Sequence, residues 1–164
     1  MATRQPLATP SDLPAEAVDK VTAALNPLIA DSFALYIKTK NFHWHVSGPR
    51  FRDLHLLFDE QADQIFASID PLAERVRKLG RLTLHSIREV ADLASITDDD
   101  EGFVGAIDMV TRLLDDNRAV VEKMRAALAV VSEANDGASE NLLQALIDEA
   151  ERRVWFLFEA SQSE

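Results

Sequence analysis

The sequence predicts an all-α protein folded as a four-helix bundle, and three observations lead to that prediction. Four long stretches carry apolar residues at the 3.6-residue helical period. The composition is 47% hydrophobic with only 5 Gly in 164 residues, which favours helices over a sheet. Two short connections and one long middle connection join the stretches. We expect one domain over residues 14–164, preceded by an N-terminal arm over residues 1–13 that lacks an apolar period.

The first long helix is predicted over residues 14–46. Its inward stripe comprises Val18, Val21, Leu25, Leu28, Ser32, Leu35 and Thr39, flanked by Ile29, Phe33 and Tyr36. The Asn26-Pro27 pair interrupts this pattern, because proline lacks an amide hydrogen and crowds the preceding turn. Either a kink or a fresh start with Asn26 as N-cap is compatible with it. Ser47-Gly48-Pro49 then ends the helix in a tight turn.

The second long helix is predicted over residues 50–79, with Gly80 as its C-terminal cap. Its core-facing residues are Leu54, Leu57, Phe58, Ala62, Ile65, Ile69, Leu72 and Val76. The segment between Arg81 and Ser95 is long enough for a short crossing helix but not for a full bundle member. We therefore expect a short helix within the long crossover.

The third and fourth helices follow that crossover. The acidic run 98–101 suits a helix N-terminus, where the positive end of the helix dipole lies. The stripe of the third helix comprises Phe103, Ile107, Val110, Leu114, Val121, Met124, Leu128 and Val131. Asn135-Asp136-Gly137 breaks it, and the fourth helix runs from about Ser139 with Leu143, Leu146, Ile147, Ala150, Val154 and Leu157 inward. Short, long and short connections in this order are typical of ferritin-like folds.

Charge and cysteine content exclude several classes of protein. The net charge of −11 opposes non-specific binding to nucleic acid and instead attracts cations. Cys is absent, so any metal must be held by nitrogen and oxygen. No apolar run approaches the roughly 20 residues of a membrane span, and no signal-peptide pattern opens the chain. We expect a soluble cytoplasmic protein.

The second predicted helix carries two pairs of metal-ligand residues. Ferritin-like bundles often hold two metals within one chain through Glu-x-x-His pairs, but no His here has Glu three residues before it. Instead, His55 and Asp59 are four residues apart, as are Asp70 and Glu74. At 3.6 residues per turn all four lie within about 100° of one another, on one face of the helix.

Their heights do not suit a single site within one chain, because Asp59 and Asp70 are about 16 Å apart along the helix axis. If the helix packs antiparallel on its copy in a second subunit, each pair lies opposite the other. Such a partner would cover a small apolar patch of Ala62, Phe66 and Ala73. His43 precedes the turn that reverses the chain, so we expect it beside His55 as a third ligand.

Each of these residues also has an ordinary structural interpretation. Asp70 before Pro71 resembles an N-cap followed by the first residue of a restarted helix. Asp59 and Glu74 are compatible with solvated positions, and His55 with a polar flank. The joint spacing with His43 favours metal binding.

The stretch HWHVSGPRFRDLHLLFDE, followed by DPLAER, resembles the Dps family of mini-ferritins, the DNA-binding proteins from starved cells. The shared signal is His-x11-His-x3-Asp-x10-Asp-x3-Glu, and the resemblance extends in helix order over nearly the whole chain. It implies that His43, His55 and Asp59 of one subunit and Asp70 and Glu74 of its two-fold partner form a ferroxidase site. It also implies a hollow dodecamer that oxidises Fe(II), preferably with hydrogen peroxide rather than dioxygen, and stores ferric mineral.

The same resemblance marks further residues. Trp44 is similar to the family's tryptophan near the iron site, where it packs the ligands or intercepts a radical; packing is the preferred interpretation. Asp136, Glu140 and Asp148 are candidates for a threefold iron-entry pore, although Asn141 stands where an acid is expected. His45 is expected to be a hydrogen-bonding neighbour and His85 a structural residue of the crossover.

DNA binding does not follow from the resemblance. Family members that bind DNA through their arm use many Lys residues, whereas Arg4 is the only cation among residues 1–19. We therefore expect weak or absent DNA binding. Three classes of function remain: a ferroxidase and iron-storage cage, which we favour, a nucleoid-associated DNA-protecting cage in which iron chemistry is secondary, and a structural bundle without metal chemistry.

Overall fold

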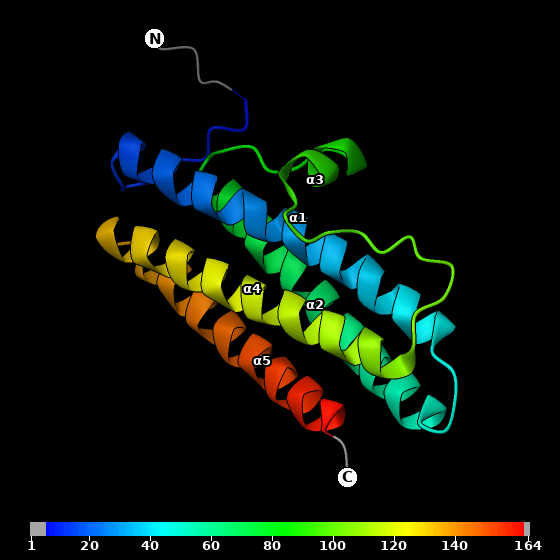
Figure 1. Cartoon of the computed structure of the whole chain (residues 1–164). Coiled ribbons are helices and arrows are strands. Elements are labelled where there is room, and N and C mark those ends of the chain that lie inside the picture. Colours follow the sequence, from blue (N-terminus) through cyan, green and yellow to red (C-terminus); the bar gives the residue numbers. More distant parts are fainter. Residues whose placement is uncertain (1–5, 163–164) are drawn as a thin grey trace.

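The computed structural model describes residues 6–162, and within them it contains helices and no strand, which confirms the predicted all-α class (Figure 1). The helices are α1 (Ala15–His45), α2 (Phe51–Lys78), α3 (Ile87–Leu93), α4 (Ala106–Glu133) and α5 (Gly137–Ser161). The four long helices pack side by side as a bundle, and the short α3 lies in the crossover between α2 and α4 (Figure 1). Every helix in the described range is too short or too polar to serve as a membrane span.

Helix α1 runs without a break through Pro27, so of the two alternatives the fresh start at Asn26 is wrong. The Asn26 side chain does not cap a helix. Its Nδ2 donates to the Leu82 carbonyl at 3.3 Å and its Oδ1 accepts from Thr83 at 3.1 Å. Asn26 therefore binds the start of the crossover to α1, a long-range contact that local sequence does not reveal.

Helix α2 also runs through its proline, Pro71. The alternative interpretation of Asp70 as the N-cap of a restarted helix is therefore wrong. The turn between α1 and α2 places Gly48 at φ 101°, a backbone conformation that favours glycine, and its carbonyl accepts from the Phe51 amide at 3.0 Å. This turn returns the chain so that the end of α1 lies beside the start of α2.

Gly80 ends α2 as predicted, with φ 76°. The amide of Arg81 donates back to the Val76 carbonyl at 3.2 Å. A Cβ at Gly80 would collide with the Thr9 carbonyl, and Arg77 donates to the Leu7 carbonyl at 2.8 Å. The described part of the N-terminal segment therefore lies against this end of α2. Arg4 lies outside the described residues, and the division of the chain at residue 13 stays a prediction.

The acidic run 98–101 does not begin a helix, because α4 starts only at Ala106. Instead Asp99 accepts from Arg112 of α4 at 2.6 Å, so the run is held by a cation rather than by a helix dipole. Phe103 and Ile107 are 74% and 42% exposed, so their predicted place in the inward stripe is also wrong. Ser86 caps α3 as an acceptor from the Glu89 amide.

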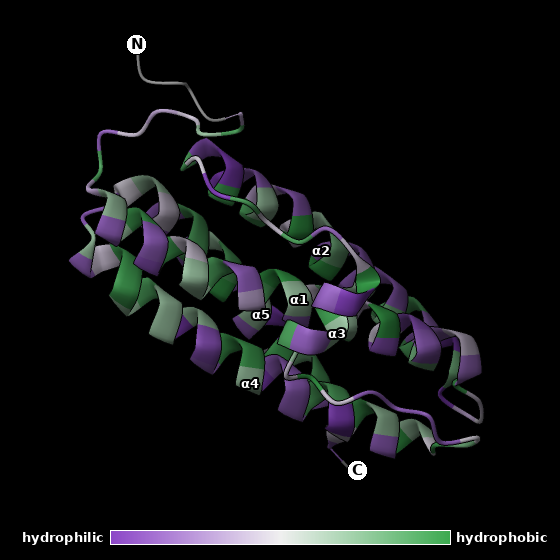
Figure 2. Cartoon of the chain, turned by 90° about the horizontal axis from the view of Figure 1, so that it is seen from above, coloured by the Kyte–Doolittle hydropathy of each residue, from purple (hydrophilic) through white to green (hydrophobic). Residues whose placement is uncertain are grey.

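The core lies between the four long helices, and hydrophobic and hydrophilic residues alternate along each of them (Figure 2). Helices α1 and α2 pack as one pair, and α4 and α5 as the other. Several polar side chains are buried among these residues. Arg153 of α5 is 4% exposed, and its Nε donates to Asn117 Oδ1 of α4 at 2.8 Å. Burial lowers the pKa of the Arg153 guanidinium to about 10.

Two ion pairs join α1 to α4 in antiparallel register. Lys123 Nζ lies 3.0 Å from Asp31 Oδ2, and Lys38 Nζ lies 2.7 Å from Asp116 Oδ2. Asp31 also accepts from the amides of Ser95 and Ile96, and Lys38 donates to the Thr97 carbonyl at 3.1 Å. The two pairs therefore hold the crossover after α3 against both helices.

Candidate metal centre

His43 and His55 lie together at the corner between α1 and α2, as the sequence predicts. Their rings stack with centroids 3.8 Å apart and an interplanar angle of 20°. The contacts are reciprocal: His43 Nδ1 lies 2.7 Å from the His55 carbonyl oxygen, and His55 Nδ1 lies 2.8 Å from that of His43. Each ring is thus oriented by the backbone of the opposite helix.

This reciprocity sets the tautomer of both rings. A carbonyl oxygen only accepts hydrogen bonds, so each Nδ1 must carry the proton. In a neutral imidazole the lone pair then lies on Nε2, and a metal-binding histidine usually has its other nitrogen hydrogen-bonded in this way. The corner therefore presents two imidazole Nε2 atoms whose lone pairs do not point into these backbone contacts.

Asp59 adds a carboxylate on the next turn of α2. Its Oδ1 lies 3.6 Å from His43 Nε2 and 2.6 Å from the Nζ of Lys40, one turn earlier on α1. The hydrogen bond from Lys40 lowers the pKa of Asp59 and raises the pKa of the Lys40 ammonium. The carboxylate is therefore ionised and already paired with a cation.

Asp70 and Glu74 lie further along α2 and are exposed. Glu74 pairs with Lys78 of the following turn at 3.4 Å, a surface contact in which both side chains are more than half exposed. Within residues 6–162, no three His, Asp or Glu side chains converge closely enough to surround a metal ion. His55 and Asp59 each lie near His43, but these three side chains do not form a metal site by themselves, and the structure does not bring Asp70 and Glu74 to them.

An exposed apolar surface accompanies these groups. Ile37 and Trp44 of α1 and Phe66 of α2 are 57%, 61% and 55% exposed. Phe66 also packs on Tyr36 at a ring distance of 5.0 Å. A hollow of about 310 Å³ is lined by Ile29, Phe33, Phe66, Ile69, Asp70, Ala73, Thr83 and Leu84. Ala62 is fully buried within its own chain, so its predicted place in this exposed patch is wrong.

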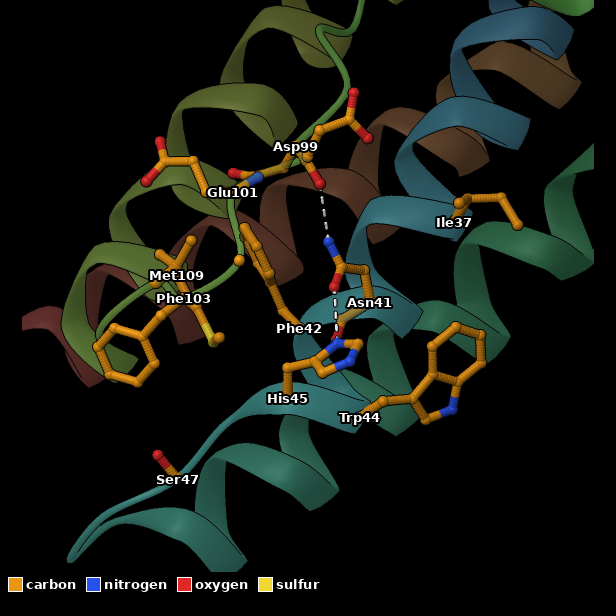
Figure 3. A pocket seen from close by; sticks show the side chains of 13 residues that line it. Ile37, Asn41, Phe42, Trp44, His45, Ser47, Asp99, Glu101, Phe103 and Met109 are labelled. Atoms are coloured by element: carbon orange, nitrogen blue, oxygen red, sulfur yellow. Dashed lines mark hydrogen bonds between the residues drawn. The ribbon is translucent and has the colours of Figure 1, made fainter.

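Trp44 and His45 lie beside a second hollow of about 560 Å³, between the end of α1 and residues 99–104 (Figure 3). His45 Nδ1 lies 2.8 Å from both oxygens of Asn41, and Asn41 donates to the Asp99 carbonyl (Figure 3). His45 is thus a hydrogen-bonding neighbour, as expected. Trp44 is 61% exposed in this chain, and its packing against the ligands of a shared site stays a prediction.

Comparison with known proteins places this architecture in a family. The ferritin-like domain family matches residues 22–161. A DNA protection during starvation protein of Brevibacillus brevis is 35% identical over 137 residues, which are 84% of this chain and 91% of the relative. The chain belongs to the Dps family.

Solved structures agree with this membership. DpsC from Streptomyces coelicolor superposes with a TM-score of 0.91 at 28% identity, covering 99% of this chain and 97% of DpsC. The Dps protein of Vibrio cholerae O1, described as a member of a superfamily of ferritin-like diiron-carboxylate proteins, superposes with a TM-score of 0.89 at 27% identity, covering 97% of this chain and all of its own. The fold of this Dps chain is therefore shared along its length.

The residues expected to line a Dps pore have different surroundings. Asp136 is 3% exposed, caps α5 as an acceptor from the Ser139 amide at 3.1 Å, and pairs with Arg75 of α2 at 2.6 Å. Its carboxylate therefore has a structural role within the chain. Glu140 is half-buried and Asp148 is exposed, and their place in a pore stays a prediction. His85 contacts Glu89 in the crossover at 3.3 Å.

Lys40 is the residue of this Dps site that the sequence interpretation missed. It precedes His43 by three residues and so shares its helix face, which is the signal that could have identified it. The spacing analysis considered only residues that can ligate a metal. A lysine cannot do so while protonated, but it can occupy the position of a cation.

Proposed function

We propose that this Dps chain oxidises Fe(II), preferably with hydrogen peroxide, at sites shared between two subunits, and stores the ferric product as mineral inside a hollow dodecamer. Membership of the ferritin-like Dps family supports a role in iron storage and protection in general. The observation that carries the finer proposal is the incomplete site. Two oriented imidazoles lie at the corner between α1 and α2 with the Asp59 carboxylate near one of them, and within residues 6–162 these groups do not form a complete metal site.

The length of α2 supports a site shared between two subunits. His55 and Asp59 lie near one end of the ligand face, and Asp70 and Glu74 near the other. An antiparallel α2 from a second copy places Asp70 and Glu74 of that copy opposite His55 and Asp59, and the two-fold axis repeats the site. The exposed Phe66 lies between the two groups in sequence and provides apolar surface for such contact.

The ligand set suits the reaction. Imidazole and carboxylate bind Fe(II) and, without thiolate, leave no competing oxidation of sulfur at the site. Two Fe(II) ions give one electron each, and one hydrogen peroxide accepts both with two protons to form two waters. This two-electron balance avoids release of hydroxyl radical. The chain supplies two Nε2 atoms held by their Nδ1 contacts, and the carboxylates that balance the metal charge.

The test replaces His43, His55 and Asp59 together with Ala. We expect loss of rapid Fe(II) oxidation in stopped-flow absorbance, while the helical signal and the oligomer mass match the unaltered protein. A matched control replaces His45, His85 and Asp12, which are also two histidines and one aspartate, and should retain the oxidation rate. Rapid oxidation that survives in the first variant would remove this site from the proposal.

The DNA-protecting cage is not favoured as the main function. The net charge of −11 repels the phosphate backbone, and the described part of the N-terminal segment, residues 6–13, carries no Lys or Arg. The name of the Brevibacillus brevis relative refers to DNA protection, which removal of Fe(II) and peroxide also provides. We propose that protection here acts through iron chemistry, in the cytoplasm.

A further inference from the structure

The Lys40 ammonium occupies the edge of the candidate metal site. Its Nζ lies 2.6 Å from Asp59 Oδ1, the same oxygen that lies 3.6 Å from His43 Nε2. The Lys40 side chain is only 17% exposed, so its stem is packed rather than free in solvent. A cation is thus held at the carboxylate oxygen that points toward the imidazole nitrogen.

We propose that Lys40 supplies the positive charge at Asp59 before a metal binds and is displaced when a divalent cation binds. This inference rests on the shared site of the proposed function. A metal ion bound to Asp59 Oδ1 would lie close to the Lys40 ammonium on the same oxygen, and the two cations would repel each other. Binding of the first metal therefore includes an exchange of one cation for another.

Lys40 would also reduce the repulsion between carboxylates when two subunits assemble without metal. In a shared site Asp59 faces Asp70 and Glu74 of a second copy, so three carboxylates surround one small space. Like charges at such distances repel strongly when they are partly removed from water. Lys40 offsets one of these charges before any metal is present, so two subunits can join without iron.

Lys78 also pairs with a proposed ligand, but it differs from Lys40 in how far its side chain is buried. It lies on Glu74, another proposed ligand, at 3.4 Å, but the Lys78 side chain is 62% exposed and the Glu74 side chain 58%. Exposed pairs of this kind are screened by solvent and contribute little. Lys78 therefore provides a matched control: the same residue type beside a carboxylate of the same proposed site, without the burial.

The experiment measures Co(II) binding to the full-length protein by calorimetry and by the visible absorption of the bound ion. Lys40→Met removes the ammonium but keeps an unbranched side chain of similar length. We expect its dissociation constant for Co(II) to fall by about tenfold, which corresponds to about 1.4 kcal/mol. Lys40→Arg should stay close to the unaltered protein, and Lys78→Met should change by less than about twofold.

A second measurement follows assembly without metal. In a chelator, Lys40→Met should dissociate at a protein concentration at which the unaltered protein and Lys78→Met remain assembled, and added Co(II) should restore it. An unchanged or weaker Co(II) affinity in Lys40→Met overturns the inference, as does unchanged assembly in the chelator or an equal effect of Lys78→Met. Absence of Co(II) binding in the unaltered protein would instead contradict the proposed function.

Discussion

At the scale of single residues, burial changes the pKa of the Asp116 carboxyl group. The Asp116 side chain on α4 is only 17% exposed, and its Oδ2 lies 2.7 Å from the Nζ of Lys38. Burial raises the pKa of the Asp116 carboxyl above its ordinary 3.8, and the Lys38 ammonium offsets only part of this effect. The ionised form of Asp116 therefore costs folding free energy.

The raised pKa predicts a direction for stability against pH. The unfolded chain releases the Asp116 proton at a lower pH than the folded chain does, so above about pH 4 the folded state binds more protons. Rising pH thus removes stability until the folded carboxyl has also ionised. Replacing Asp116 with Asn removes this titration.

We expect the free energy of unfolding of the unaltered protein to fall relative to that of Asp116→Asn as pH rises from about 4 to 7. Urea unfolding of both proteins at a series of pH values measures the difference. Other carboxyl groups titrate in both proteins and cancel in this comparison. A difference that stays constant or changes in the opposite direction would show that burial does not raise this pKa.

At the scale of helices, acidic and basic side chains of α1 pair with basic and acidic side chains of α4. Along α1 an acid, Asp31, precedes a base, Lys38, by two turns, and α4 presents Asp116 and Lys123 with the same spacing. Antiparallel packing pairs each acid with a base only in one register. Because the same side chains hold residues 95–97, the crossover is attached where the two helices meet.

Replacing Asp31 with Ala should therefore affect both the bundle and the crossover. The change leaves Lys123 and the amides of Ser95 and Ile96 without their acceptor, at a cost of roughly 3 kcal/mol. Urea unfolding measures that cost, and limited proteolysis should cut faster within residues 94–105.

Glu16→Ala is the control on the same helix. Glu16 pairs with Lys20 at 2.8 Å, but both side chains are exposed, so we expect a much smaller loss of stability than in Asp31→Ala. Equal losses of stability in the two variants would mean that burial of the Asp31 pair contributes nothing.

At the scale of the whole molecule, the ferroxidase chemistry is expected to depend on assembly. Phe66 is 55% exposed on the α2 face that carries the two ligand groups, yet it cannot bind a metal. Phe66→Glu should lower the mass measured by light scattering from that of a dodecamer and abolish rapid Fe(II) oxidation, with unchanged helical content. Burying an unpaired carboxylate in an apolar contact between subunits is strongly unfavourable, so the variant should not form that contact.

Leu7→Glu is the matched control, because Leu7 is also exposed, at 62%, but belongs to the N-terminal segment and not to α2. It should retain both mass and oxidation. Rapid oxidation by a monomeric Phe66→Glu variant would contradict a site shared between subunits.

Much of this architecture could be predicted because helices depend on local pattern. The apolar period identified the four long helices, and Gly48 and Gly80 marked turns that require positive φ. The predictions that failed concern local signals overridden by tertiary contacts. Asn26 binds the crossover instead of capping a helix, and Asp99 of the acidic run pairs with Arg112 across a loop.

By itself, the sequence determined the helical class, the order of the connections and the spacing of His55, Asp59, Asp70 and Glu74 on α2, because all of these depend on residues close in the chain. Only the tertiary structure decided which side chains meet across helices. It stacks His43 on His55 with both Nδ1 atoms on backbone carbonyls, places Lys40 on Asp59, and commits Asp136 to Arg75. Such contacts depend on the relative position of two helices, and the residue pattern within one helix does not specify that position.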